Sequence, residues 1–294
     1  MDVAVVGSLN LDTTVRVPRL PAPGETVLGA GRAIDTGGKG ANQAVAAARL
    51  GRTTAMVGAV GPDPAGDLLI AALEDEGVET GAVLRSALPS GVAHITVDDA
   101  GENMIVVDPG ANGALAPDDV AAAAEVIVEA SVTLVQLEIP LPAVEQVAAL
   151  ASRLILNPAP ARPLSPGLVT AAEVIVPNAT ELALLAGGPE PGTPTEAAEA
   201  AMLLPGAVVV TLGAEGAVVV DEGSWEHVPA PVVDAVDPTA AGDAFCGGLA
   251  DALVGNASLL EAVRWAVRCG AVAATRPGAQ ASLPTREDVL ALEV

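Results

Sequence analysis

Short apolar runs rich in β-branched residues alternate along the chain with Ala- and Leu-rich stretches of helical length. The runs begin at Val3, Thr54, Val132, Leu154, Glu173 and Ala207, and each ends at a turn or polar residue. The stretches between them cover residues 41–50, 65–76, 117–129, 141–151 and 196–204. Strands that alternate with helices indicate right-handed crossover units. The pattern predicts an α/β fold, a three-layer α/β/α sandwich with a mostly parallel central sheet.

Two segments break this alternation. Residues 12–34 carry two apolar runs around the turn LPAPGE, and residues 91–107 carry a strand, a Gly-containing turn and a second strand. Because no helix separates these strands, we expect a small β-sheet lid outside the main sheet, with His94 on its surface. A protruding apolar sheet must cover a site or pair with another copy. The lid therefore also predicts a homodimer.

The C-terminal third is predicted to be mostly helical, over residues 242–254, 259–274 and 286–292. No internal repeat or low-complexity linker separates it from the rest. We therefore expect one domain over residues 1–294, with the lid formed by about residues 12–34 and 91–107.

Composition excludes several classes of protein. With 51% hydrophobic and 17% charged residues, the chain is neither disordered nor fibrous. Aromatic residues make up 1% and the net charge is −24, which argues against nucleic acid and anionic membranes as partners. No apolar run approaches the ~18 residues of a membrane span. Two cysteines, Cys246 and Cys269, are too few for a disulfide framework, so we expect a reduced, cytoplasmic protein.

A glycine-rich loop precedes the first predicted helix, in the segment TGGKGANQAVAAARLG from Thr36. The start of such a helix offers free N–H groups and the positive end of the helix dipole to a phosphate or polar ligand. Lys39, the only lysine of the chain, lies in this loop. The loop is not a Walker A motif, because Gly40 and not Ser or Thr follows the lysine. The alternative is a plain glycine turn whose solvated lysine survives by chance.

A second loop of small residues leads into the helix near position 243. The backbone N–H groups of Ala240, Ala241 and Gly242 could approach an anion closely and form an anion hole. Asp243 follows them directly. The carboxylate either caps the helix, worth about 1 kcal/mol, or accepts the proton of a hydroxyl that attacks phosphorus. Spacing alone leaves both roles open.

Polar residues follow most of the predicted strands, where open α/β sheets bind their ligands. They are Asn10, Asp12, Glu138, Asn157, Asn178 and Glu181. Each could be a helix cap, but together they favour one shared site. Gly213 and Gly216 form a turn that could let a flat nucleotide pass. His94 and His227 have no acid or nucleophile nearby in sequence, so His-dependent hydrolysis is not supported.

The chain resembles the ribokinase branch of the PfkB-type carbohydrate kinases from end to end. The motifs that carry the resemblance occur in order: GSLNLD at Gly7, PAPGET at Pro21, GGKGANQAVAAARLG at Gly37, GENMIVVDPGAN at Gly101, QLEIP at Gln136, LNPAPAR at Leu156, VPNATE at Val176, TLGAEG at Thr211, VDPTAAGDAF at Val236 and TRPGAQASLP at Thr275. Two of these motifs, GGKGANQAVAAARLG at Gly37 and TRPGAQASLP at Thr275, are characteristic of this branch. The resemblance implies a ribokinase-like fold.

This resemblance implies MgATP-dependent phosphorylation of the 5-hydroxyl of D-ribose, giving D-ribose 5-phosphate. Asp243 matches the family's general base, and the backbone amides of Ala240, Ala241, Gly242 and Asp243 match its anion hole. The motif is Ala-Ala-Gly-Asp here, a mild departure from the commoner Gly-Ala-Gly-Asp.

The resemblance also assigns the surrounding residues. The positions that match sugar contacts are Asn10, Asp12, Gly38, Lys39, Gly40, Asn42 and Glu138. Those that match nucleotide contacts are Asn178, Thr211, Gly213, Gly216 and Gly242, and Asn178 with Glu181 is associated indirectly with Mg²⁺. The positions around an activating K⁺ are Asp237, Thr239, Ala273, Arg276, Gly278 and Ser282. Val267 stands where relatives often carry His or Asn beside the adenosine.

Two alternatives stay open. The first is another PfkB-type kinase, for 2-deoxyribose, fructose or a nucleoside, although the scarcity of aromatic residues disfavours a stacked base. The second is a catalytically silent sugar-binding regulator. The presence of both Asp243 and Lys39 argues against this second alternative.

Overall fold

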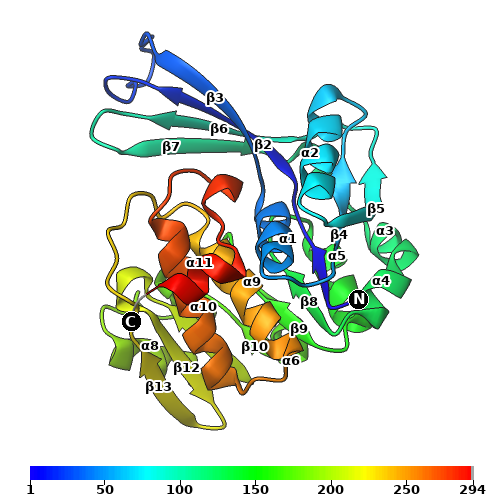
Figure 1. The fold of residues 1–294 in the computed structure, drawn as a ribbon, viewed down its shortest axis with the longest axis vertical. Helices are drawn as coiled ribbons and strands as arrows, with labels where there is room; N and C mark the ends of the chain where they lie inside the picture. Colours follow the sequence, from blue (N-terminus) through cyan, green and yellow to red (C-terminus); the bar gives the residue numbers. More distant parts are fainter. Residues whose placement is uncertain (293–294) are drawn as a thin grey trace.

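A nine-stranded sheet forms the middle layer of the structure, a computed structural model that describes residues 1–292 (Figure 1). In spatial order its strands are β13 (Ser224–Val228), β12 (Ala217–Asp221), β11 (Ala207–Thr211), β10 (Val174–Ile175), β9 (Leu154–Leu156), β8 (Val132–Val135), β1 (Val3–Val6), β4 (Thr54–Val60) and β5 (Glu79–Arg85). All neighbours pair in parallel except that β12 is antiparallel to β11 and β13. The prediction of a mostly parallel sheet is confirmed.

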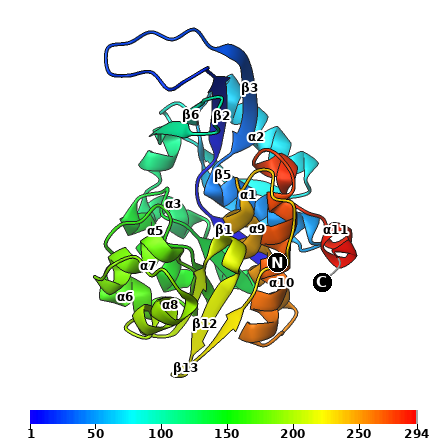
Figure 2. The same cartoon turned by 90° about the vertical axis from the view of Figure 1, so that its left-hand side faces the viewer.

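Helices cover both faces of this sheet (Figure 2). One face carries α1 (Lys39–Arg49), α2 (Pro64–Asp75), α9 (Ala241–Val254), α10 (Leu259–Ala274) and α11 (Arg286–Ala291). The other carries α3 (Pro117–Ala122), α4 (Ala124–Glu129), α5 (Leu141–Leu150), α6 (Pro166–Ala171), α7 (Ala179–Ala186) and α8 (Pro194–Ala201). Short 3-10 helices η1 (Gly110–Ala114), η2 (Gly213–Glu215) and η3 (Gln280–Ser282) lie in connections. The three-layer sandwich is therefore confirmed.

The strand β1 is buried on both of its faces, which explains why its sequence is apolar at every position. Along β1, Val3 and Val5 pack into the core on the α1 face, whereas Val6 packs into the core on the α5 face, so both sides are buried. Small residues bring the helices close together. A Cβ atom on Gly247 of α9 would lie 2.5 Å from the Cβ of Ala46 on α1. The chain's Ala- and Gly-rich composition thus provides close helix packing in place of aromatic bulk.

The structure differs from the sequence-based elements in several places. The strands β5, β12 and β13 and the short helix α6 were not predicted. The stretch predicted as one helix over residues 117–129 is divided at Ala123, which leaves helical geometry with a ψ of 13°. The helix α7 was not predicted, although Asn178 and Glu181 form a capping box at its start. The sequence N-A-T-E carries the spacing of such a box, so this signal was available.

A smaller sheet of four strands stands outside the main sheet, at the top of Figure 1. Its order is β3 (Ala30–Gly37), β2 (Asn10–Arg16), β6 (Gly91–Val97) and β7 (Asn103–Asp108). The strands β2 and β6 pair in parallel, and the outer pairs are antiparallel. His94 is exposed on β6, as predicted. This small sheet extends slightly beyond the predicted residues at each end.

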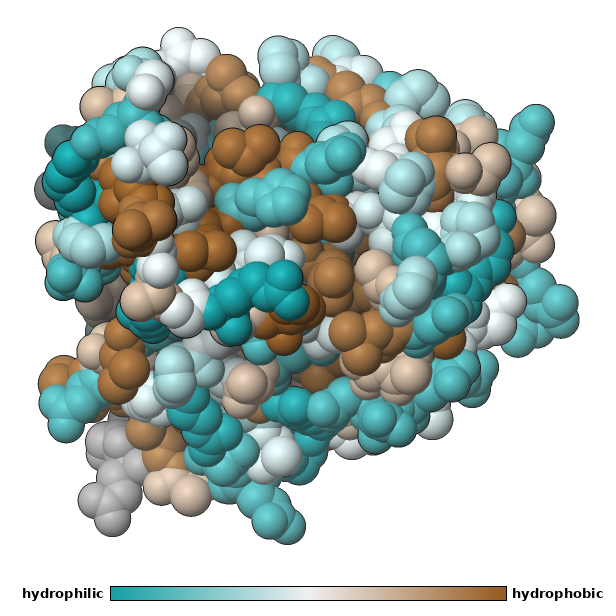
Figure 3. Space-filling view, turned by 90° about the horizontal axis from the view of Figure 1, so that it is seen from above, coloured by the Kyte–Doolittle hydropathy of each residue, from teal (hydrophilic) through white to brown (hydrophobic). Residues whose placement is uncertain are grey.

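Apolar side chains are exposed on the small sheet. They are Ile34, Met104, Ile105, Val106 and Val107, with exposed fractions between 41% and 61%. Figure 3 shows apolar residues gathered on the face of the molecule seen from this side.

Both cysteines are free thiols buried in the helical layer, Cys246 on α9 and Cys269 on α10. In residues 1–292, no helix combines the length and the apolar character needed to cross a membrane.

Candidate active site

The polar residues that follow the strands gather at the carboxyl edge of the main sheet. Glu138, after β8, accepts a 3.1 Å hydrogen bond from the backbone N–H of Lys39. Asn157, after β9, accepts a 3.2 Å bond from the Gln43 side chain. Asn178, after β10, forms a parallel bridge with Thr211 at the end of β11. The structure therefore brings these residues to one edge, as the sequence predicts.

Asp243 is the third residue of α9, and its side chain does not cap the helix. The N-cap is Ala240, which is held in the left-handed region with a φ of 59° and provides no side-chain cap. The Asp243 carboxylate instead accepts hydrogen bonds from Asn42 Nδ2 at 2.9 Å and from Gln43 Nε2 at 3.0 Å. Of the two roles left open by the sequence, capping is excluded. The residue is only 7% exposed.

Charge at the site is concentrated around Lys39 and Asp243. Burial raises the pKa of Asp243, whereas Lys39 and the amides of Asn42 and Gln43 act to lower it. Burial lowers the pKa of Lys39, but Asp243, Glu138 and Glu181 outweigh it, and the net pKa is above its ordinary value. Lys39 is thus a half-buried cation in the field of three acidic groups.

The loop before α1 contacts the end of β1 closely. Gly38 has a φ of 90°, and a Cβ atom there would lie 2.8 Å from the backbone nitrogen of Asn10. The backbone at Gly38 therefore lies against the segment from Ser8 to Asn10, and a side chain at this position would clash with it. Gly40 is buried, and its N–H donates to the Ser8 hydroxyl at 3.4 Å. Ser8 in turn donates to Glu138, which holds this carboxylate next to the loop.

Two side chains of β2 face the same space. Asn10 is 4% exposed, and its Oδ1 accepts a 2.8 Å bond from Asn112 Nδ2. This bond leaves the Asn10 amide nitrogen free to donate to a ligand. Burial, with Glu138, Asp35 and Asp243 nearby, raises the pKa of Asp12 to about 7. One side chain is thus a donor and the other an acceptor, which suits the hydroxyl groups of a polyol.

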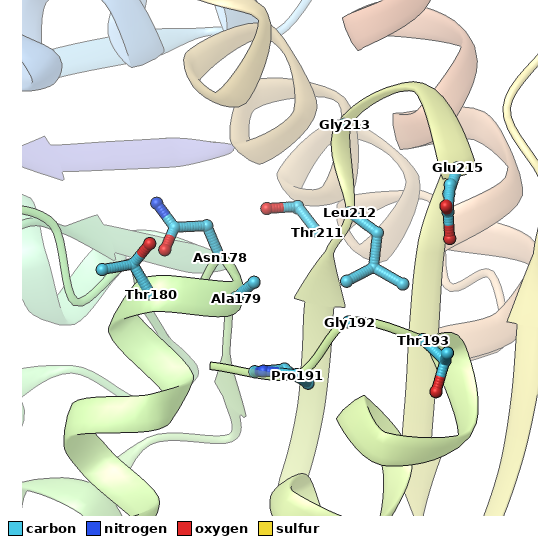
Figure 4. A pocket seen from close by; sticks show the side chains of 10 residues that line it. All are labelled: Asn178, Ala179, Thr180, Pro191, Gly192, Thr193, Thr211, Leu212, Gly213 and Glu215. Carbon is cyan, nitrogen blue, oxygen red and sulfur yellow. The ribbon is translucent and has the colours of Figure 1, made fainter. Parts of the chain in front are cut away.

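A cavity of about 610 Å³ adjoins the start of α9. Its walls include the residues expected at a nucleotide, namely Asn178, Thr211, Gly213, Gly216 and Gly242, together with Ala241 of the expected anion hole. Phe245 and Val267 add apolar surface. A smaller cavity of about 300 Å³ shares Asn178, Thr211 and Gly213 with it. Figure 4 shows the Thr211 hydroxyl directed toward Asn178, whose amide group points away from Thr211.

The expected Mg²⁺ residues are ordered by the start of α7. Asn178 Oδ1 accepts from the Glu181 N–H at 2.8 Å, and Glu181 Oε2 accepts from the Asn178 N–H at 2.9 Å. Burial raises the pKa of Glu181, although the Asn178 N–H and Lys39 act in the opposite direction. Amide and carboxylate oxygens are the donor types that suit Mg²⁺. These residues therefore fit an indirect role at the ion.

The residues expected around K⁺ come together from two loops. Asp237 accepts from the N–H of Thr239 and from the N–H of Gly278, both at 2.9 Å. Ser282 Oγ donates to Ala279 O at 2.8 Å and lies 3.5 Å from Thr239 O. This cluster contains carboxylate, hydroxyl and carbonyl oxygens, the hard donors of an alkali cation.

Two of the expected K⁺ residues are otherwise engaged. Arg276 pairs its side chain with Asp288, so only its backbone is free to face the cluster. Ala273 O accepts from the Arg276 N–H at 3.1 Å. In residues 1–292 no group of three or more His, Cys, Asp or Glu is placed to hold a metal ion.

Three buried side chains of the site were not predicted. Gln43 and Gln136, both 0% exposed, stand behind Asp243, and Asn112, 1% exposed, orients Asn10. Helical spacing could have indicated Gln43, because positions three and four residues after Lys39 share its face of the helix. Gln136 and Asn112 lie within the motifs QLEIP and GENMIVVDPGAN, but their roles could not be inferred locally, since each meets its partner only through the tertiary fold.

The strand-end edge of this mostly parallel sheet holds a buried carboxylate, polar side chains of β2 and α1, and a cavity at the start of α9. These features fit a kinase for a small hydroxylated substrate. The chain belongs to the pfkB family of carbohydrate kinases, whose model matches residues 1–286. The family predicted from the motifs is thereby confirmed.

Similar proteins cover almost the whole chain. The ribokinase of Haemophilus influenzae is 39% identical over 98% of this chain and 97% of its own length. The deoxyribokinase of Salmonella typhi is 37% identical over 98% and 97%. Among solved structures, the ribokinase of Thermotoga maritima has a TM-score of 0.91 at 35% identity, covering 99% of this chain and 98% of its own. A ribokinase of Arabidopsis thaliana complexed with ribose and ATP has a TM-score of 0.87 at 32% identity, covering 98% and 97%.

Proposed function

We propose that the protein is an ATP-dependent kinase that phosphorylates the 5-hydroxyl of D-ribose to give D-ribose 5-phosphate. The observation that carries this proposal is the placement of Asp243. Its carboxylate lies between the polar pocket of β2 and α1 and the first N–H groups of α9, where a sugar hydroxyl and a phosphoryl group would meet. Similarity to ribokinases, one of them complexed with ribose and ATP, supports ribose as the acceptor.

In this mechanism Asp243 accepts the proton of the 5-hydroxyl. The hydroxyl oxygen forms the new bond to the γ-phosphorus, the bond from this phosphorus to the β,γ-bridging oxygen breaks, and its electron pair leaves with ADP. Charge that spreads over the phosphoryl oxygens would be stabilised by Lys39 and by the N–H groups at Ala240 to Asp243. Of these N–H groups, that of Ala241 donates to Pro238 O at 3.1 Å in this structure. Positioning and electrostatic stabilisation account for most of the rate in such transfers.

The sugar is held by complementary donors and acceptors. Asn10 Nδ2 donates to hydroxyls, Asp12 accepts from them, and Asn42 Oδ1, buried without a hydrogen-bond partner in the described part of the chain, provides a further acceptor. The carboxylate of Glu138 completes the pocket, held in place by the N–H of Lys39 and the Ser8 hydroxyl. The adenine moiety would lie in the apolar cavity beside Gly213, Gly216 and Val267.

Two cations complete the proposal. Asn178 and Glu181 would hold Mg²⁺ indirectly, and this ion neutralises part of the triphosphate charge. Asp237, Thr239, Ala273, Arg276, Gly278 and Ser282 would surround an activating K⁺. The loops that carry these oxygens flank the start of α9, so a cation there would order the anion hole.

The small sheet is proposed to be the lid of a single kinase domain and the interface of a homodimer. Strand register separates its two faces. Asp12 lies in one row with Ala93 and Val107, which faces the sugar pocket, whereas Ile34, Thr13, His94 and Val106 form the next row, on the opposite face. The exposed apolar side chains of this face, Ile34 and Val106, favour pairing with another copy. Cytoplasmic location is part of the same proposal, as expected of a reduced enzyme that uses ATP.

A second acceptor, 2-deoxyribose, is favoured by one observation, the 37% identity to a deoxyribokinase. A coupled assay of ADP release with ribose, 2-deoxyribose, fructose and adenosine, each with and without K⁺, separates the candidates. We expect the highest kcat/KM with ribose. A higher value with another acceptor would reassign the substrate, and no ADP release with any of them would favour the sugar-binding regulator.

A further inference from the structure

A buried chain of side-chain amides stands behind the carboxylate of Asp243. Gln136, which follows β8, donates from Nε2 to Gln43 Oε1. Gln43, on α1, donates from Nε2 to Asp243 Oδ1 at 3.0 Å and to Asn157 Oδ1 at 3.2 Å. Asn157 is anchored in turn, because its Nδ2 donates to Val176 O at 2.9 Å.

These bonds leave the Gln43 amide one orientation. Its oxygen is engaged by Gln136, and the oxygen of Asn157 is turned toward Gln43 because the Asn157 nitrogen is bonded to the backbone. The Gln43 nitrogen must therefore face Asp243. Gln43 and Gln136 are both 0% exposed, so water does not compete for these bonds.

The two carboxylate oxygens of Asp243 are thus held by different partners. Oδ1 is held from the interior by the fully buried Gln43, whereas Oδ2 accepts from Asn42, whose own Oδ1 is buried without a partner in the described residues. We propose that Gln43 is a positioning residue for phosphoryl transfer, which fixes Oδ1 and presents Oδ2 to the attacking hydroxyl. This inference rests on the proposed role of Asp243 as the base.

Other charged and titratable groups around Asp243 stay in place when Gln43 is changed. They are Lys39 on α1, Glu138 after β8, Asp12 on β2 and Cys246 on α9 itself. A donor to an ionised carboxylate favours the charged form, so its loss raises the pKa of the carboxyl group. A change in the pH profile therefore reports on the Gln43 bond, with the surrounding charges constant.

The test replaces Gln43 by methionine, which has a similar volume but cannot donate. We expect kcat to fall about 10- to 100-fold, as for loss of a hydrogen bond to a charged group. The acidic limb of the kcat profile should move up by about one pH unit, while the KM for ribose stays within about twofold. Gln43→Glu, which replaces the donor by a second acid, should move the limb further.

Gln146→Met on α5 is the matched control, because it makes the same substitution at a glutamine remote from Asp243, and we expect wild-type kinetics. If Gln43→Met leaves both kcat and the acidic limb of its pH profile unchanged, the inference is overturned. A parallel loss of ribose binding by calorimetry would also overturn it, since Gln43 would then act on the sugar pocket and not on the base.

If Gln43→Met shows no cooperative thermal transition, Gln136→Met provides the same test from the far end of the chain of amides. It keeps the Gln43 nitrogen but frees its oxygen, so we expect a smaller loss of kcat with the same direction of limb shift, and wild-type values would overturn the inference. The wild type is assayed first with all four acceptors, and the variants are measured with the acceptor that it uses. If ribose is not the substrate, the wild-type assay shows this before any variant is measured, so this outcome is distinct from failure of the inference about Gln43.

Discussion

The side-chain amide of Asn42 donates a 2.9 Å hydrogen bond to the carboxylate of Asp243, across 201 positions of the chain. The bond forms because α1 and α9 pack against each other on one face of the sheet, with their first turns at the same edge (Figure 1). The loop proposed to bind sugar and the base proposed to act on it are therefore joined by one contact. A substitution on either helix should therefore affect both sugar binding and the position of the base.

Asp243→Asn should abolish most activity without loss of sugar binding. The amide cannot accept the hydroxyl proton, so we expect kcat to fall about 100- to 10,000-fold, the usual contribution of a general base. Ribose affinity, measured by calorimetry, should change little. Asp221→Asn, the same change at an exposed residue of β12, is the control. Near-normal turnover in Asp243→Asn would remove this residue from the role of base.

Ribose binding should depend on pH through Asp12. Its pKa of about 7 means that the carboxylate is mostly protonated at pH 6 and mostly ionised at pH 8. Because the ionised form accepts hydrogen bonds from hydroxyls, the KM for ribose should fall by about tenfold over this range. Asp12→Asn should have a flat profile, and a wild-type KM independent of pH would contradict the prediction.

The same raised pKa has a consequence for stability. The folded protein holds the Asp12 proton more tightly than the unfolded chain, whose pKa is near 3.8. The contribution of this group to the free energy of unfolding is therefore largest below pH 4 and is lost as pH rises through 7. Asp12→Asn should then have a higher Tm than the wild type at pH 8. A lower Tm of Asp12→Asn at pH 8 would show that the ionised Asp12 carboxylate does not destabilise the folded protein.

Ala240 should tolerate glycine but not valine. Its φ of 59° lies in the left-handed region, which costs about 1–2 kcal/mol for a side chain and more for a β-branched one. Ala240→Gly should keep kcat, whereas Ala240→Val should lower it by misplacing the N–H groups that follow. Glu222→Val, at a φ of 47° between β12 and β13, should lose stability alone. Wild-type kcat in Ala240→Val would argue against an anion hole here.

Potassium should raise activity above that measured in sodium. The cluster of oxygens around Asp237 and Ser282 adjoins the loop that precedes α9, so an ordered cation would hold the anion hole in place. ADP release is compared in matched chloride salts at constant ionic strength. Asp237→Asn should reduce the difference between the two salts. Equal rates in sodium and potassium would refute the cation proposal.

The outer face of the small sheet should hold two copies together. Val106, 61% exposed, lies on this face, and Val106→Glu should convert the dimer to a monomer in multi-angle light scattering. Val128→Glu, at a valine 55% exposed on α4, is the matched control and should stay dimeric. A monomeric wild type at micromolar concentration would contradict the interface.

The architecture could be predicted from the sequence because the signals for strands and helices are local. Strand runs such as 3–6 and 207–211 show their burial in their own composition, and the helix over residues 259–274 was predicted at its observed bounds. Motifs likewise indicated Lys39, Asn42, Asp243 and the strand ends, since each lies beside a glycine turn or a helix start. The split at Ala123 was missed because a run of alanines gives no breaking signal.

Only the tertiary structure decided what each of these residues contacts. Spacing could not choose between a cap and a base for Asp243, because the choice depends on Asn42 and Gln43, two residues of another helix. The pKa of Asp12, and the exclusion of water around Gln43 and Gln136, likewise depend on neighbours distant in the chain. Local sequence determines which elements form. Burial and electrostatics at the site depend on distances between those elements, and these distances exist only once the chain is packed.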